Sequence, residues 1–437
     1  MAIGPGVVVA GSVMGSGELI NTPVQAAKFG FVLLWVVIVS CLIKYFLQVE
    51  IGRHCLAHHR TTFAALNTMP GPNLRGTSWV GLSYMAGFVL TTLSSVGMMR
   101  ATAGLLASLR PLGGNQNLSI DIWTVLVFII VVAVLWRGLY DDIEKFITVA
   151  VFGFSISVVI GVFLIQRTEY RITSEQLLSG LRFSLGDQPK LAAYAVISLL
   201  GALGTTANEL FMYPYWILEK GYAKHVGPQQ SEGWTDRARG WIRVLKADAL
   251  ICTILATVIT AAYFLMGAAV FYGRSDLPGG DQILPRMSAM FTETYGRWGL
   301  WLYSIGAICT LFSTLVVANA AVARMWADMF VSLKWLDGEN KKALRKCYRV
   351  AIILTLGVGL AIALIARRPP EELVIFAQYV AGLYCTPLLM VAICWLAFHT
   401  DKRVRMSRVT AIFLLLSVAV ITSCIVMYLV IESGIFG

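Results

Sequence analysis

The stretch GSVMGSGELINTP, residues 11–23, interrupts a hydrophobic run with Gly15-Ser16-Gly17 and places Glu18 directly after the interruption. The chain of 437 residues is 57% hydrophobic and 14% charged, whereas soluble proteins carry about 25% charged residues. Its long apolar runs therefore predict a polytopic membrane protein. Inside a bilayer, a helix break needs partners for its backbone groups, and an ionisable side chain points to a function.

Eleven apolar segments are long enough to cross a bilayer, which takes about 20 residues each. We predict that residues 1–437 form one all-α membrane domain. The expected spans cover about 3–25, 28–53, 77–109, 120–139, 141–166, 191–220, 236–273, 297–330, 343–366, 371–398 and 407–432.

Basic residues gather in the loops after even-numbered spans. The loop from Arg324 to Arg349 holds seven Lys or Arg against three acids. The positive-inside rule then predicts a plasma (inner) membrane protein with a cytoplasmic N-terminus and an external C-terminus. The net charge of +11 thus sets topology and gives no reason to expect a nucleic-acid partner. Eight scattered cysteines, without a CxxC pair, are expected to be core residues.

A second interruption lies in the sixth span, near Gly204–Asn208, and is followed by Glu209. The first and sixth spans each begin a block of five. Paired interruptions in corresponding spans are typical of transporters built from inverted repeats. We therefore expect repeat one at about 1–166, repeat two at about 191–398, and one extra helix at about 407–432.

The two breaks bring oxygen atoms to the predicted membrane interior. Glu18 and Glu209 would each begin a half-helix, whose N-terminus favours a carboxylate. Freed carbonyls and polar side chains would complete a cage suited to a hard divalent cation such as Mg²⁺, Mn²⁺ or Ca²⁺. The candidate ligands are Glu18, Glu209, Gly15, Ser16, Thr205, Thr206, Asn208 and Gln378, and the candidate gating or lining residues are Tyr213, Tyr215, Ser313 and Thr314.

Structural roles remain open for the same residues. Glu18 could cap a helix near the interface, and the glycines could serve close packing. Gln378 could bond a neighbouring helix, while mid-helix hydroxyls usually bond back to their own helix. The tyrosines could simply pack. Lys44, Glu50 and Arg100 are expected to reach the interface by snorkelling from near their span ends.

Several motifs resemble the NRAMP family of divalent-metal transporters, in the amino acid–polyamine–organocation superfamily. Phe29–Val37 resembles the family's junction of helices 1 and 2, and Ala377-Gln378-Tyr379 and Thr386-Pro387 resemble its helix 10. The basic start of the ninth span, Arg345–Arg349, also fits. This resemblance implies the LeuT-type fold, with two inverted five-helix repeats, one extra helix and a site between helices 1 and 6.

The sequence also departs from the family pattern. Gly15-Ser16-Gly17-Glu18 stands where the family has Asp-Pro-Gly-Asn, and Thr205–Glu209 contains no Met, Pro or His where the family has Met-Pro-His. Loss of the soft methionine ligand favours harder ions, and related magnesium transporters lack it too. The third span has no acid between Thr77 and Leu109, and no histidine lies in the predicted membrane core. These absences argue against proton coupling.

The sequence thus favours a transporter that moves a divalent cation by alternating access. The metal would be its substrate, with no cofactor, and the chain would act as a monomer in the bilayer. The main alternative is a transporter of a small organic solute, an amino acid or amine, on the same fold. An enzyme is disfavoured because no nucleophile–base set, Walker loop or HExxH motif occurs.

Overall fold

The computed structural model describes residues 15–137, 140–274 and 279–434, and these are mostly helical. In chain order the elements are η1 (Gly17–Asn21), α2 (Thr22–Phe29), α3 (Leu34–His58), α4 (Thr62–Leu66), β1 (Asn73–Leu74), β2 (Thr77–Ser78), α5 (Trp79–Thr91), α6 (Leu93–Leu109), α7 (Gln116–Arg137), α8 (Tyr140–Leu164), η2 (Ile165–Arg167), α9 (Ser174–Gly180), α10 (Pro189–Ala202), α11 (Ala207–Glu219), α12 (Tyr222–Val226), α13 (Trp234–Phe271), η3 (Gly280–Gln282), α14 (Ile283–Met287), α15 (Ala289–Tyr295), α16 (Trp298–Ser332), α17 (Lys341–Ala366), α18 (Pro370–Val380), η4 (Ala381–Cys385), α19 (Thr386–Phe398) and α20 (Arg408–Ser433).

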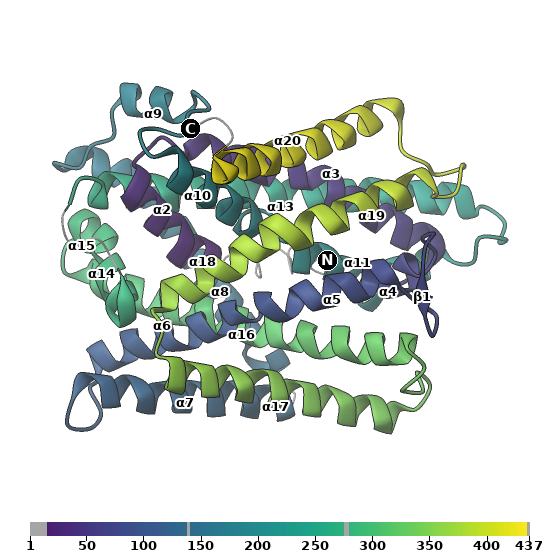
Figure 1. Cartoon of the computed structure of the whole chain (residues 1–437), viewed down its shortest axis with the longest axis horizontal. Coiled ribbons are helices and arrows are strands. Elements are labelled where there is room, and N and C mark those ends of the chain that lie inside the picture. The colour runs from purple at the N-terminus through teal and green to yellow at the C-terminus, as the bar shows by residue number, and fades with distance from the viewer. Residues whose placement is uncertain (1–14, 138–139, 275–278, 435–437) are drawn as a thin grey trace.

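Within the described ranges, ten helices or near-continuous helix pairs are long and apolar enough to cross a membrane. They run roughly along the long axis of Figure 1, and they correspond to the second to eleventh predicted spans. The first predicted span, about 3–25, lies partly outside the described residues; its described portion is η1 and the start of α2. The prediction of an all-α integral membrane protein is confirmed.

Some boundaries differ from the predicted ones for local reasons. The second span was expected from residue 28, but α2 ends at Phe29 and α3 begins at Leu34. Gly30, between them, has φ +59° and lies against the ring of Tyr272, so the chain turns there at a residue that tolerates this conformation. The third span is divided at Thr92, and the tenth contains the π-helical turn η4.

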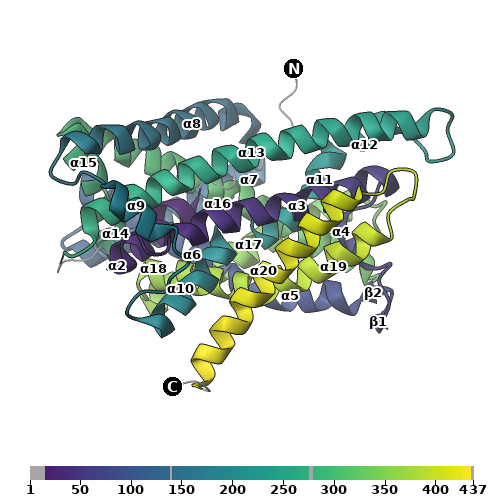
Figure 2. The same ribbon diagram turned by 90° about the horizontal axis from the view of Figure 1, so that it is seen from above.

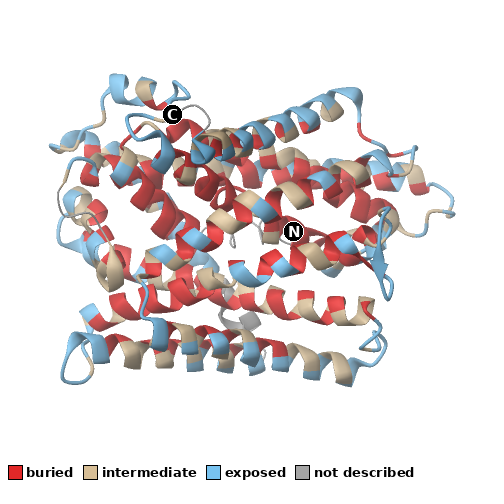
Figure 3. Cartoon of the chain, viewed as in Figure 1, coloured by how far each residue is buried: buried red, intermediate tan, exposed pale blue. Residues whose placement is uncertain are grey.

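The long helix α13 lies beside α3, α2 and α8, while α18 packs against α6 and α10. Figure 2 shows α20 crossing obliquely on the outside. Buried residues concentrate between the helices, and exposed residues are frequent on α7, α17 and α20 (Figure 3). Many exposed side chains on these outer helices are large and apolar, for example Ile129 and Leu354, which suits contact with lipid.

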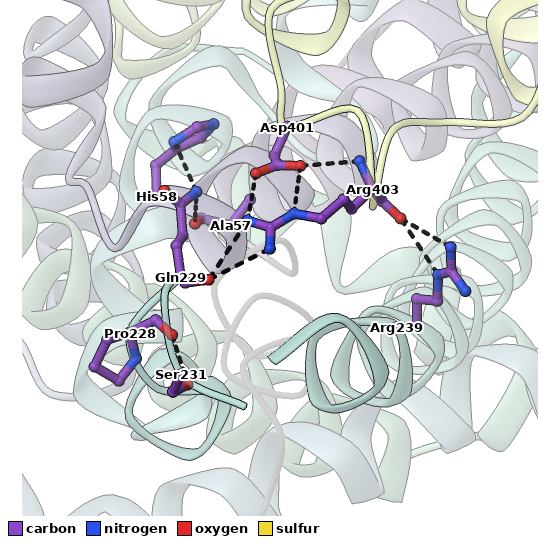
Figure 4. Close-up of polar contacts among 8 residues, drawn as sticks. All are labelled: Ala57, His58, Pro228, Gln229, Ser231, Arg239, Asp401 and Arg403. Carbon is purple, nitrogen blue, oxygen red and sulfur yellow. Dashed lines mark hydrogen bonds and ion pairs between the residues drawn. The ribbon is translucent and has the colours of Figure 1, made fainter. Parts of the chain in front are cut away.

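Three loops predicted on the same side of the membrane meet at one end of the bundle (Figure 4). Gln229 donates from Nε2 to the carbonyl of Ala57 at the end of α3. Arg403, after α19, donates to Asp401 and to the Gln229 carbonyl, and Arg239 of α13 donates to the Arg403 carbonyl. We call these five residues the loop clasp. Hydrogen bonds from Arg403 lower the pKa of Asp401, so this carboxylate stays ionised at neutral pH.

The prediction that Lys44, Glu50 and Arg100 snorkel is wrong, because all three are buried. Glu50 pairs with Arg53 at 2.9 Å. Arg100 donates from Nε to Asp281 at 2.6 Å and so joins α6 to the η3 segment. Lys44 bonds to backbone carbonyls inside the bundle, as described below. Each charge is satisfied within the protein, as burial requires.

Close contact between α10 and the tenth span depends on glycine. A Cβ atom on Gly201 would overlap the carbonyl oxygen of Gln378. We expect Gly201→Ala to lower the free energy of unfolding by about 1–3 kcal/mol, because the two backbones would have to separate. Thermal melting of the purified protein measures this. Gly357→Ala on α17 is the matched control, since no atom lies within 4 Å of its added Cβ; equal melting temperatures for the two variants would contradict the packing argument.

Candidate functional site

The sixth span is interrupted between α10, which ends at Ala202, and α11, which begins at Ala207. Gly204 in the interruption has φ +64°, a conformation that glycine adopts without strain. Thr206 then caps α11: its hydroxyl accepts the Glu209 N–H at 3.3 Å, and the Thr206 N–H donates to Glu209 Oε2 at 2.7 Å. This reciprocal capping box starts the second half-helix and fixes the Glu209 carboxylate at the break.

Glu18 has a similar local role in the first span. Its Oε2 accepts the N–H of Gly15, three residues earlier, at 3.0 Å. Its Oε1 accepts the hydroxyl of Thr260 on α13 at 3.3 Å. The side chain is only 1% exposed. Each of the two membrane carboxylates therefore accepts the N–H of the residue three positions before it.

A cavity of about 950 Å³, its open mouth included, lies where the first, third, sixth, eighth and tenth spans meet. Among the described residues that line it, Glu209 is the one ionisable residue. The other polar lining residues carry hydroxyl or amide groups: Ser16, Thr91, Thr92, Ser94, Ser95, Thr206, Asn208, Thr314 and Gln378. The cavity thus presents one carboxylate among neutral polar groups and a larger number of apolar side chains.

Ser16 and Gln378 form a polar chain across this cavity. Gln378 donates from Nε2 to the Ser16 hydroxyl at 3.2 Å, and the Ser16 and Ser94 hydroxyls are hydrogen-bonded at 3.0 Å. The Gln378 Oε1 atom is buried and has no hydrogen-bond partner among the residues that the structure describes. A buried amide oxygen without a donor is costly, and a cation would satisfy it.

The third span contributes more to the cavity than the sequence suggested. Asn208 accepts the Tyr84 hydroxyl at 2.8 Å and donates to Thr91 at 3.2 Å. Thr91, Thr92, Ser94 and Ser95 line the cavity around the short interruption between α5 and α6. The cluster of four hydroxyl residues within an apolar span was the signal that could have revealed it.

Six of the eight candidate ligands line the cavity: Gly15, Ser16, Thr206, Asn208, Glu209 and Gln378. Glu18 and Thr205 do not. Glu18 is turned toward α13, and Thr205 donates to Gln48 Oε1 of α3 at 2.8 Å. Of the two carboxylates predicted to form a cage, only that of Glu209 lines this cavity, whereas Glu18 contacts Thr260 of α13.

The candidate gating residues are also divided. Thr314 lines the cavity, and its hydroxyl bonds back to the Thr310 carbonyl of its own helix at 2.9 Å. Ser313 lies outside the lining. Tyr213 is fully buried in the core, and Tyr215 donates to Asp328. Only Thr314 of these four is placed to contact a molecule in the cavity.

The carbonyls freed at the end of α10 are occupied by side chains of α3. Lys44 Nζ donates to the carbonyls of Leu200 and Leu203, each at 2.5 Å. The Ser40 hydroxyl donates to the Leu203 carbonyl at 3.3 Å. Freed carbonyls were predicted to contact an ion. In the structure these two instead accept hydrogen bonds from Lys44, which was predicted to lie at the interface.

The cavity extends from the helix breaks toward one end of the bundle. Its lining runs along α11 from Thr206 to Trp216 and along α16 from Thr314 to Met325. Those ends of α11 and α16 lie toward the end of the molecule that carries the loop clasp (Figure 1). Met98, Met212 and Met325 also line it, so sulfur atoms are present even though the helix break itself lacks methionine.

Comparisons with known proteins agree with this architecture. The model of the natural resistance-associated macrophage protein-like family matches residues 6–431. An uncharacterized protein of Pasteurella multocida is 22% identical over 419 residues, which make up 92% of this chain and 86% of that protein.

Solved structures show the same fold. The manganese transporter of Eremococcus coleocola, in complex with an aromatic bis-isothiourea substituted compound, superposes with a TM-score of 0.68 at 18% identity, over 99% of this chain and 87% of that one. MhsT in complex with L-phenylalanine gives 0.64 at 14% identity over 98% of each chain. The fold is thus of the LeuT type, and the chain belongs to the natural resistance-associated macrophage protein-like family.

Proposed function

We propose that this protein transports a divalent metal cation by alternating access and binds it in the cavity at Glu209. The observation that carries the proposal is the single carboxylate at a helix break, surrounded by hydroxyl and amide oxygens. A carboxylate in an apolar environment attracts a cation more strongly than it would in water. Membership in the family and the likeness to a manganese transporter support a metal as the cargo.

The revised ligand set consists of residues that line the cavity. Glu209 supplies charge, Gln378 supplies an unpartnered amide oxygen, and Ser16 and Thr206 supply hydroxyls. Oxygen ligands favour Mg²⁺, Mn²⁺ or Ca²⁺. Glu18 is not one of these ligands; it stabilises the first span by accepting the Gly15 N–H.

The cavity supports an inward-facing arrangement in a plasma membrane protein with a cytoplasmic N-terminus and an external C-terminus. It extends toward the loop clasp, whose loops are the ones that the positive-inside rule assigns to the cytoplasm. The repeats at about 1–166 and 191–398, with the extra helix at about 407–432, would rock about this site. The proposal includes no proton coupling; within the part of the chain that the structure describes, the lining offers Glu209 and no second ionisable group to relay a proton.

Substituting each carboxylate in turn distinguishes the proposed metal ligand, Glu209, from the capping residue, Glu18. We expect Glu209→Gln to weaken Mn²⁺ binding by about 100-fold or more, because loss of even an indirect partner of a metal ligand costs about 10–100-fold. Glu18→Gln should lower stability while changing the Kd by less than about tenfold. Isothermal titration of purified protein with Mg²⁺, Mn²⁺ and Ca²⁺ measures both. Equal losses of metal affinity in the two variants would contradict a site with a single carboxylate. Binding of an amino acid or amine without any metal would favour an organic solute as the transported substrate.

Accessibility tests the direction of the cavity. In a background lacking reactive cysteines, Ala318→Cys, on the lining face of α16, should react with a membrane-impermeant maleimide from the side that carries Asp401. The matched control is Leu311→Cys on the same helix, which is fully buried in the core and should stay unlabelled. Labelling of Ala318→Cys only from the opposite side would contradict the proposed opening.

A further inference from the structure

Lys44 is a buried cation that the proposed binding of a divalent ion does not use. It lies ten residues into α3, or about 15 Å along the helix axis, and hence near the middle of a hydrocarbon layer about 30 Å thick. Its side chain is 0% exposed. A lysine at this depth is rare and marks a functional position by default.

The ammonium is held by backbone oxygens of the helix break. Its hydrogen-bond acceptors, the Leu200 and Leu203 carbonyls, belong to the carbonyl end of α10 and the residue that follows it. The last carbonyls of a helix have no partner within the helix and carry partial negative charge. Such a group of oxygens is a natural position for a cation, and here the cation is covalently attached to α3.

The neighbours on α3 form a polar stripe with Lys44. Ser40, one turn before it, donates to the Leu203 carbonyl, and Gln48, one turn after it, accepts the Thr205 hydroxyl. The three side chains repeat every four residues and therefore face the same way. Together they satisfy successive groups of the interruption from Leu203 to Thr205. Gly204 packs directly on the backbone of Cys41, which brings the break against this stripe.

Lys44 offsets part of the negative charge near the break. Its ammonium interacts electrostatically with both Glu209 and Glu18. With both carboxylates ionised and the lysine protonated, one net negative charge remains for the cargo. Without the lysine, two carboxylates would share an apolar region and the α10 carbonyls would lack donors, both of which are costly.

We propose that Lys44 is a tethered cation: its ammonium occupies the carbonyl end of α10, where a free metal ion would otherwise bind, and offsets one of the two membrane carboxylates. The cavity then binds one divalent ion at Glu209, and the α10 carbonyls take no part in its coordination. This assignment rests on the proposed function for the divalent ion, while the occupation of a cation position by Lys44 is independent of it.

Two variants test the tethered cation. Lys44→Gln keeps a hydrogen-bond donor but removes the charge, and we expect its affinity for Mn²⁺ to rise about tenfold because a nearby positive charge is gone. Lys44→Ala leaves space beside the carbonyls, and we expect NaCl to raise its melting temperature by about 2–4 °C over choline chloride at equal ionic strength. Wild-type protein should melt at the same temperature in both salts.

Two control variants separate the charge of Lys44 from its hydrogen bonds. Lys44→Arg keeps the charge, and Ser40→Ala removes a donor to the same carbonyl without changing charge; both should retain wild-type Mn²⁺ affinity and salt response. A gain in either Lys44 assay supports the tethered cation, and the absence of both gains overturns it. If Lys44→Ala cannot be purified, Lys44→Gln serves in the melting assay as well. If wild-type protein binds no divalent ion, the proposed function fails, and the melting assay alone still decides the role of Lys44.

Discussion

The structure depends on one constraint: a helix broken inside a bilayer must find partners for its freed backbone groups, because lipid offers none. At the amino end of the second half-helix, Thr206 and Glu209 satisfy each other's N–H groups. At the carboxyl end of the first, Lys44 donates to two carbonyls and Ser40 to one of them. The protein itself therefore supplies partners for the Thr206 and Glu209 N–H groups and for the Leu200 and Leu203 carbonyls.

This arrangement separates the two acids that looked equivalent in the sequence. Glu18 and Glu209 each accept the N–H three residues before them, so both follow the same local rule. Their surroundings decide the difference: Glu18 meets Thr260 of α13, whereas Glu209 lines the cavity. A site with one carboxylate holds a divalent ion less tightly than one with two, which suits a transporter that must release its cargo. In the proposed site, Gln378, whose Oε1 has no hydrogen-bond partner among the described residues, would add a ligand without adding charge.

The fold was largely predictable because the bilayer imposes a strong pattern on sequence. Apolar runs and loop charges located the spans, and Gly204 and Glu209 marked the break. Predicted helix boundaries were wrong where a single residue determines them. Gly30 is an example, because the chain turns at its positive φ and α3 begins only at Leu34. The partners of Lys44 could not be predicted, because its distance from the span end was compatible with snorkelling and only the packing of α3 on the break shows otherwise. The roles of the Thr91 and Ser94 hydroxyls could not be predicted either, because only the fold shows that they bond to Asn208 and Ser16.

In the proposed arrangement, one ion binds at Glu209 and Lys44 keeps ions away from the α10 carbonyls. Anomalous diffraction from crystals grown with Mn²⁺ tests it most directly, because the metal's position is seen without substitutions. We expect a single anomalous peak in the cavity, within coordination distance of the Glu209 carboxylate and the Gln378 Oε1 atom. A peak at the carbonyls of Leu200 and Leu203, with the Lys44 side chain displaced, would contradict it.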